Sequence, residues 1–355
     1  MKKLKLPGLI DIHVHMRDPG ATHKEDWQTG TAAALAGGIT MLLAMPNTTP
    51  PITTAPTFQR AIKVADSNAL CDFGQFLGAG PENAQKILGV APQAAGLKMY
   101  LDHTFGELRL DQMPLWIEHF KYWPKNLPIA VHAEKKTMAA AILLAALHER
   151  PLHICHVSRK EEIAIIRLAK ERGLKITCEV SPHHLFLNEA DIPNIGKGFA
   201  EVRPVLASPQ DQASLWENLA VIDCIATDHA PHTVKEKQSD TPPPGFPGLE
   251  TALPLMLNAV KLGRLTLDDL VLKMHTNPKR IFNLPDQPET FVEVDLEHKF
   301  EISAHGMFSR CAWTPFDGQM VSGSVHRVVL RGKEVFQDGE VLSHPGFGCN
   351  IRKTG

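Results

Sequence analysis

The sequence predicts an α/β protein built on a closed parallel (β/α)8 barrel, the TIM-barrel architecture. Eight short segments are apolar at nearly every position, which is typical of strands buried on both faces. Amphipathic or alanine-rich stretches separate them, and strands that alternate with helices in this way indicate a parallel sheet. An open, doubly wound sheet is the alternative, but the glycine fingerprint GxGxxG does not follow the first apolar segment.

The elements follow one another regularly along the chain. The expected strands span residues 9–15, 39–46, 71–77, 96–101, 128–134, 152–158, 175–181 and 224–230. The expected helices span residues 24–36, 56–67, 110–119, 137–147, 159–172, 210–218, 248–262 and 267–275. Two polar connections, 188–209 and 230–249, are long enough to indicate functional loops. Both follow a strand, so both belong to the C-terminal face of the barrel.

Residues 290–355 have a different pattern. Short β-like pieces at 291–296, 327–330 and 334–336 are separated by turn signals such as Asp317-Gly318 and Asp338-Gly339. We therefore divide the chain into a barrel, residues 1–289, and a small β extension, residues 290–355, that packs on it.

Composition and charge exclude several classes of protein. The formal net charge is −2, so the chain has no strongly basic field for nucleic acid or anionic lipid. No apolar run approaches the roughly 18 residues that span a bilayer, and the N-terminal lysines are not followed by the apolar stretch of a secretory signal. Six cysteines without a CxxC pair fit reduced thiols. We expect a cytoplasmic protein that acts on a small molecule, with no nucleic-acid or membrane partner.

Reactive side chains gather at the ends of the expected strands. The first strand ends in Asp11-Ile-His13-Val-His15. Residues two apart on a strand face the same way, so His13 and His15 can bind one divalent ion. One such pair is a weak signal, but the pattern recurs at later strand ends, which a barrel brings to one pocket. The later residues are Lys98, His132, Cys155, His156, Glu179, His183, His184, Asp228 and His232.

Lys98 needs a partner, because an ammonium group is costly to bury. One interpretation is an ion pair with Asp102 or Glu134. The other is that its neutral amine takes up CO2, and that the resulting carbamate bridges two metal ions with one oxygen for each. We favour the carbamate, because bound metals would stabilise the carboxylated form.

The motifs around these residues resemble those of the amidohydrolase superfamily and, within it, the dihydroorotases. The resemblance rests on His13-Val-His15-Met-Arg17-Asp-Pro-Gly, Met-Pro-Asn47-Thr, Leu-Lys98-Met-Tyr, Val-His132-Ala-Glu, Ile-Cys-His156-Val-Ser, Val-Arg203-Pro and Thr-Asp228-His-Ala-Pro-His232. The stretch Pro-Pro-Pro-Gly-Phe-Pro-Gly-Leu-Glu-Thr is similar to the dihydroorotase domains of animal multifunctional pyrimidine proteins.

The resemblance implies a zinc enzyme that interconverts N-carbamoyl-L-aspartate and L-dihydroorotate in de novo pyrimidine (UMP) synthesis. Carboxylated Lys98 would bridge two zinc ions. The ligands of one would be His13, His15 and Asp228, and those of the other His132 and His156. Asp228 would also carry the proton between the attacking water and the leaving nitrogen. The substrate-binding residues would be Arg17, Asn47 and Arg203 for the carboxylate, and His232 for the ring, with backbone contacts from Pro244 and Gly245.

The family also has a mobile loop over the substrate, and the segment after the Lys98 strand corresponds to it. There Thr104 would donate to the carboxylate and Phe105 would exclude water, whereas the alternative is an ordinary connection. Cys155 and Glu179 could hold a third zinc ion with a shared histidine. Otherwise Cys155 is a buried thiol, and Glu179 accepts a hydrogen bond from a ligand imidazole. We interpret the pair 183–184 as supporting or structural.

Two other functions fit part of the pattern. A dihydropyrimidinase, hydantoinase or allantoinase would use the same metals, but its ring has no carboxylate that requires Arg17, Asn47 and Arg203. A non-catalytic scaffold on the same fold usually lacks metal ligands, and none is missing here.

The start of the chain departs from the superfamily, whose members usually carry β-strands before the first barrel strand. About eight residues precede that strand here. Either the β extension is reduced, or the chain is one domain of a longer multifunctional protein. We favour the second interpretation, in which carbamoyl-phosphate synthetase and aspartate transcarbamoylase domains would be neighbours. The family also implies a homodimer.

Overall fold

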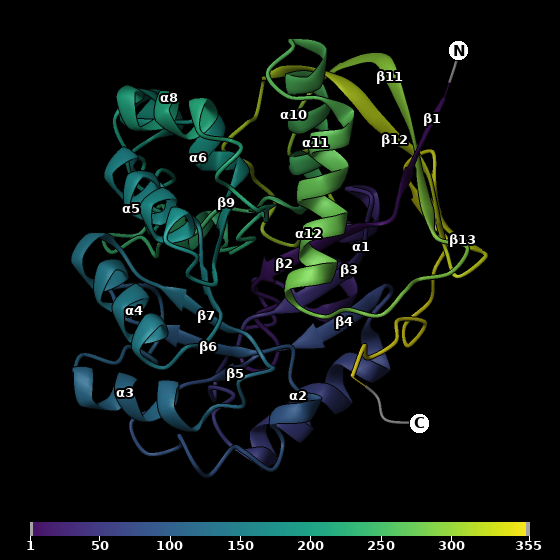
Figure 1. Cartoon of the computed structure of the whole chain (residues 1–355). Helices are drawn as coiled ribbons and strands as arrows, with labels where there is room; N and C mark the ends of the chain where they lie inside the picture. Colours follow the sequence, from purple (N-terminus) through teal and green to yellow (C-terminus); the bar gives the residue numbers. More distant parts are fainter. Residues whose placement is uncertain (1–2, 353–355) are drawn as a thin grey trace.

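The computed structural model describes residues 3–352 and is an α/β structure. Helices surround a group of parallel strands, and a separate antiparallel sheet lies at one side of the molecule (Figure 1). Within the described residues, none of the helices is long and apolar enough to span a bilayer. The parallel strands are β2 (Leu9–Val14), β3 (Ile39–Ala44), β4 (Asp72–Gln75), β5 (Leu77–Gly78), β6 (Leu97–Tyr100), β7 (Ile129–His132), β8 (Leu152–Ile154), β9 (Ile176–Val180) and β10 (Cys224–Ile225).

The parallel strands form two sheets, one with the order β2-β3-β4 and one with the order β10-β9-β8-β7-β6-β5. The sheets meet at the expected run 71–77, where β4 pairs with β3 and β5 pairs with β6. At the other edge, Val14 and His229 form an isolated parallel bridge, and the N–H of His15 donates to the carbonyl of His229 at 2.8 Å. The segment after β10 therefore lies against the end of β2.

Side chains of the parallel strands alternate between two apolar clusters, as the two-residue period of a strand requires. Leu42 belongs to the large cluster between the strands and the surrounding helices. Its neighbours Met41 and Leu43 belong to a smaller cluster that also contains Ile10, Ile12 and Phe282. Both faces of the strands are thus buried, which explains their near-continuous apolar sequence.

The helices occupy the expected connections, and short helices appear in the two long loops. They are α1 (Trp27–Ala36), α2 (Ala55–Asn68), α3 (Met113–Tyr122), α4 (Lys135–Leu147), α5 (Lys160–Glu171), α6 (Pro182–Phe186), α7 (Ile192–Ile195), α8 (Pro209–Glu217), α9 (Val234–Lys237), α10 (Leu249–Lys261), α11 (Leu267–Val271) and α12 (Asn277–Ile281). Single turns lie at η1 (Ala91–Gln93) and η2 (Glu189–Asp191). Side-chain caps fix several starts: Asp26 accepts from the N–H of Thr29 before α1, and Thr233 accepts from that of Glu236 before α9.

The expected helix over 267–275 is longer and less regular than predicted. A π-helical turn, η3 (Leu272–Thr276), follows α11 and leads into α12. Pro278 lies in the first turn of α12 and has no N–H to donate, so an unbroken α-helical ladder cannot run through this point.

The antiparallel sheet contains strands from both ends of the chain. Its order is β1-β11-β12-β13-β14, with β1 (Leu4–Pro7), β11 (Phe291–Glu301), β12 (Met320–Leu330), β13 (Lys333–Gln337) and β14 (Glu340–Val341). Our sequence division placed the first residues with the barrel, but β1 pairs with β11, with Leu4 opposite Val294. The expected extension includes 353–355, which lie outside the described residues. Helix α10 packs against β12 and joins this sheet to the rest of the molecule (Figure 1).

Candidate active site

Two histidines of β2 and an aspartate after β10 form the first group of candidate metal ligands. His13 Nε2 lies 3.2 Å, and His15 Nε2 lies 3.1 Å, from the same oxygen of Asp228, and all three side chains are buried. Burial alone would raise the pKa of Asp228, but His13 and His15 hold it well below its usual value. Two imidazoles and an ionised carboxylate that converge in this way are a donor set for zinc.

The charges around His13 attract a cation. Burial and Lys98 oppose protonation of this ring, but the carboxylates of Asp228 and Glu179 outweigh them and raise the pKa of His13 to about 10. The two buried carboxylates therefore favour a positive charge at this position. A divalent ion at this position would compensate the same negative charge.

His132, at the end of β7, and His156, after β8, form a second group. Their rings are buried, with His132 Nδ1 2.8 Å from His156 Nε2. Burial holds both pKa values low, to about 3 for His132 and well below the ordinary value for His156. Within residues 3–352, His132 Nε2 and His156 Nδ1 have no hydrogen-bond partner. Neutral, buried rings with free nitrogen atoms match the requirements of metal ligands.

Lys98 lies between the two groups and is fully buried on β6. Its Nζ is 2.9 Å from Cys155 Sγ and 3.4 Å from His13 Nε2. Among the described residues no carboxylate forms an ion pair with it, and Asp102 instead accepts from the backbone N–H of Glu134 at 2.7 Å. The ion pair with Asp102 or Glu134 that the sequence left open is therefore absent.

Cys155 and Glu179 form a further cluster of possible ligand atoms together with His13, which also belongs to the first group. Glu179 contacts His13 Nδ1 through Oε1, and its Oε2 lies 3.0 Å from His153 Nε2. Burial would raise the pKa of Glu179, but His13 and His153 hold it well below the usual value. Glu179 thus occupies the place of either a third-ion ligand or an acceptor for a ligand imidazole.

Three of the predicted substrate-binding residues lie together beside the first group. Arg17 Nη2 is 3.1 Å from His232 Nε2, and Asn47 Oδ1 is 2.6 Å from His15 Nδ1. Asn47 Nδ2 donates to the carbonyl of Phe105 at 3.2 Å, and the edge of the Phe105 ring packs on His232 with 4.9 Å between centroids. The segment after Lys98 therefore covers the predicted carboxylate-binding residues.

The remaining predicted binding residues are held less directly. Arg203 pairs with Glu201 Oε2 at 3.1 Å and is about a third exposed, so its hydrogen bonds go to its own loop. The carbonyl of Pro244 contacts His232 Nε2 at 3.1 Å. Gly245 has φ +145°, and a Cβ there would lie 2.4 Å from the carbonyl of Ala230. Thr104 lies half-buried in the connection that carries Phe105.

The backbone is strained at three predicted site residues. Arg17, His156 and Asp228 have φ values of 59°, 34° and 48°, in the left-handed region that is unfavourable for residues with a side chain. Asp11 supports this arrangement, because its Oδ2 accepts from Thr227 Oγ1 at 2.6 Å and ties β2 to the segment that carries Asp228.

Sequence reasoning missed several buried charged residues around the site. Lys24 contacts His232, Glu25 pairs with His229, and Lys237 donates to three carbonyls of the 201–245 region. The partners of Lys24 and Glu25 lie more than 200 residues away, and those of Lys237 are backbone carbonyls 6 to 36 residues away, so no local pattern indicated these contacts. The predicted supporting pair, His183 and His184, packs ring to ring at 4.4 Å.

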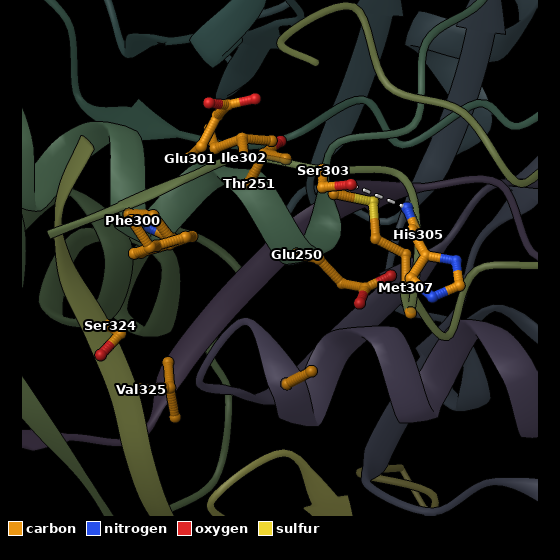
Figure 2. A pocket seen from close by; sticks show the side chains of 13 residues that line it. Glu250, Thr251, Phe300, Glu301, Ile302, Ser303, His305, Met307, Ser324 and Val325 are labelled. Atoms are coloured by element: carbon orange, nitrogen blue, oxygen red, sulfur yellow. Dashed lines mark hydrogen bonds between the residues drawn. The ribbon is translucent and has the colours of Figure 1, made fainter. Parts of the chain in front are cut away.

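One cavity lies beside the predicted substrate-binding residues, and another lies away from the site. One of about 210 Å³ lies beside Asn47, Thr48, Phe105 and Glu107. Another, of about 300 Å³, lies away from the candidate ligands, between α10 and the strands β11 and β12 (Figure 2). Glu250 is in its wall, where burial raises the pKa of this carboxyl to about 7.

Comparisons with known proteins agree with this geometry. The family model described as dihydro-orotase-like matches residues 2–70. A dihydroorotase of Pyrococcus furiosus is 34% identical over 99% of this chain and 86% of its own length. The chain belongs to the dihydroorotase family. The resemblance inferred from the motifs is therefore confirmed.

Two further relatives are a multifunctional protein and a domain of such a protein. The multifunctional protein CAD of Squalus acanthias is 58% identical over 99% of this chain, but the chain spans only 16% of that protein. The solved structure of an inactive dihydroorotase-like domain, from a CAD-like multifunctional protein of Chaetomium thermophilum, matches with a TM-score of 0.85 and 32% identity. That match covers 98% of this chain and 99% of the Chaetomium domain.

Proposed function

We propose that this chain is a dihydroorotase, which interconverts L-dihydroorotate and N-carbamoyl-L-aspartate in pyrimidine synthesis. The observation that carries the proposal is the contact of Asn47 with His15, a member of the first group of candidate metal ligands, with Arg17 two residues further along the chain. The metal ligands could activate a cyclic amide. Arg17 and Asn47 could bind the carboxylate that distinguishes dihydroorotate from other cyclic amides. Family membership alone does not decide this point, because the Chaetomium relative is named inactive.

We also infer that the parallel strands close into an eight-stranded barrel. The bridge between Val14 and His229 supports closure, because it links the first parallel strand to the segment after the last one. The segments β4 and β5 are separated by Phe76 alone and count as one strand. A closed barrel would bring all the candidate ligands to one C-terminal face.

The metals we propose are two zinc ions. His13, His15 and Asp228 would hold one, His132 and His156 the other, and carboxylated Lys98 would bridge them. The free ring nitrogens of His132 and His156 and the lack of a carboxylate partner for Lys98 support this assignment. Bound zinc would act as a Lewis acid that polarises the amide carbonyl and lowers the pKa of water. Cys155 and Glu179 could hold a third ion together with His13; otherwise Cys155 is a buried thiol and Glu179 accepts from the imidazole of His13.

Asp228 would carry the proton in the reaction. Ring opening adds the oxygen of water to the amide carbon and breaks the bond from that carbon to the ring nitrogen. An ionised Asp228 can accept one proton from the water and deliver it to the leaving nitrogen. The new carboxyl group loses the second proton of the water to solvent, and the single product is N-carbamoyl-L-aspartate. Cyclisation follows the same route in reverse.

Arg17, Asn47 and Arg203 would bind the substrate carboxylate, and His232, Pro244 and Gly245 would bind the ring. Asn47 already contacts His15 of the first ligand group, and Arg17 contacts His232. Arg203 would exchange its partner Glu201 for the substrate. Phe105 and Thr104 would close over the bound ring, because Phe105 packs on His232 and its carbonyl is held by Asn47.

A substrate panel tests the function. Purified protein with zinc is assayed for turnover of L-dihydroorotate, dihydrouracil and hydantoin. We expect turnover of L-dihydroorotate alone, and we expect Arg17→Gln to lower kcat/KM at least tenfold without loss of zinc. Preference for hydantoin or dihydrouracil would assign the site to another cyclic amidohydrolase. Zinc binding without turnover of any ring would support the scaffold function.

We further propose a homodimer and a place in a longer chain beside carbamoyl-phosphate synthetase and aspartate transcarbamoylase domains. The homodimer rests on the family resemblance alone. The longer chain is supported by the 58% identity to a region that makes up 16% of the Squalus multifunctional protein.

A further inference from the structure

Lys24 is a buried lysine that none of the proposed roles includes. It lies between β2 and α1, with a side chain that is only 7% exposed. Its Nζ is 2.8 Å from Glu236 Oε1 on α9 and 3.1 Å from His232 Nδ1. It also lies 4.7 Å from the centre of the Phe105 ring. One ammonium group thus contacts a histidine of the proposed substrate pocket and the aromatic residue that covers it.

The contacts of His232 decide which of its nitrogens carries the proton. A lysine ammonium can only donate, and the carboxylate of Glu236 keeps Lys24 charged. His232 Nδ1 must therefore be the acceptor, and the proton must lie on Nε2. The carbonyl of Pro244, 3.1 Å from Nε2, is the matching acceptor.

The opposite tautomer fits the contacts poorly. A proton on Nδ1 would face the ammonium of Lys24, and the carbonyl of Pro244 would lose its donor. Only the contact between Arg17 Nη2 and His232 Nε2, also 3.1 Å, would gain a hydrogen bond. The Nε2–H tautomer thus has two hydrogen bonds and one repulsive contact, with Arg17 Nη2, whereas the opposite tautomer has one hydrogen bond and one repulsive contact, with Lys24 Nζ. Burial and the positive charges of Arg17, Lys24 and Lys237 hold the pKa of His232 far below its usual value, so the ring is neutral and must choose one tautomer.

We propose that Lys24 is a positioning residue that fixes His232 as the Nε2–H tautomer, and that this choice leaves the Nη2 group of Arg17 free for the substrate. Arg17 keeps its bond from Nε to the carbonyl of Pro231 at 3.1 Å, which holds the guanidinium in place. With a proton on Nε2, His232 cannot accept from Arg17. Both side chains then present donors to an acidic ligand instead of satisfying each other.

This role rests on the proposed function, since it concerns the recognition of a carboxylate substrate. The same role explains the position of Phe105. The Phe105 ring lies over Lys24 and within 5.2 Å of the guanidinium carbon of Arg17. Both cations face an aromatic ring, which attracts positive charge. The covering segment is therefore held by the same charges that would bind the substrate.

The tautomer can be measured without any assay of activity. We would record nitrogen-15 NMR spectra of the zinc-loaded protein labelled in its histidine side chains, and identify His232 by the signals lost in His232→Gln. We expect a protonated Nε2 and an unprotonated Nδ1 in the wild type. Lys24→Met should shift the proton toward Nδ1, while Lys24→Arg, which keeps a donor-only group, should retain the wild-type pattern. Lys235→Met is the matched control, because Lys235 lies on α9 next to Glu236, the partner of Lys24, and is exposed.

A wild-type His232 that carries its proton on Nδ1 would overturn the proposal, and so would an unchanged pattern in Lys24→Met. The wild-type spectrum decides the tautomer even if Lys24→Met does not fold. With L-dihydroorotate, Lys24→Met should raise KM about tenfold and change kcat less than about threefold. Wild-type protein that shows the expected tautomer but no turnover of dihydroorotate would refute the proposed function and leave the assignment of Lys24 in place.

Discussion

Lys237 offers a sharp test of how the substrate loops are held, through the substitution Lys237→Met. Its Nζ donates to the carbonyls of Glu201, Pro243 and Gly245 at 2.8, 3.0 and 3.2 Å, and its side chain is 1% exposed. Methionine has a similar length and no donor, so all three hydrogen bonds are lost. The carbonyl of Glu201 keeps the N–H of Gly245 as a donor at 2.9 Å. At about 1 kcal/mol of net stability for each hydrogen bond, the free energy of unfolding should fall by about 3 kcal/mol.

The assay is urea unfolding followed by tryptophan fluorescence, because Trp313 lies 5.3 Å from Lys237 Nζ. Lys235→Met is the matched control and should leave the unfolding free energy within about 0.5 kcal/mol of the wild type. The three carbonyls belong to the loops that carry Arg203 and Gly245, so KM for dihydroorotate should also rise in Lys237→Met while the zinc content stays constant. An unfolding free energy equal to that of the control would refute the reasoning.

Three further predictions concern the metal centre and the covering loop. Asp228→Asn should lower kcat by about a hundredfold or more, because an amide cannot carry the proton. Steady-state kinetics, with zinc counted on the same sample, checks this prediction. Near-normal turnover would contradict it. Wild-type protein grown with carbon-13-labelled CO2 should show a carbamate carbon signal by NMR. Lys98→Met should abolish both this signal and tight zinc binding. A wild type that lacks the signal at full zinc loading would exclude the bridge. Phe105→Ala should change both kcat and KM, because water enters the covered site, and unchanged values of both would reject the lid.

The strands and the candidate ligands were predictable from sequence because both depend on local patterns. A strand buried on both faces is apolar throughout, and His13 and His15 share a face because they are two residues apart. The convergence of these side chains with Asp228 then follows from placing parallel strand ends at one edge. The structure confirms that Asp228 lies within 3.2 Å of both imidazoles.

Other features could not be predicted, because they depend on contacts between distant segments. Strand β1 is four residues long, and only its pairing with β11, almost 290 residues later, gives it a place in the sheet. Lys24 and Lys237 lie in polar sequence without a recognisable motif. Lys24 contacts His232, more than 200 residues away, and Lys237 donates to carbonyls as far away as that of Glu201, 36 residues earlier. The pairing of Arg203 with Glu201 is likewise a property of one loop conformation, which the motif around Arg203 does not contain.

The most direct test of the account is a chelator titration in which dihydroorotate turnover and zinc content are measured on the same samples. We predict that the active protein holds two or more zinc ions per chain, that turnover falls in step with zinc removal, and that added zinc restores it. Full turnover in protein stripped of metal, or two bound zinc ions without any turnover, would contradict the assignment of this buried cluster as the catalytic centre of a dihydroorotase.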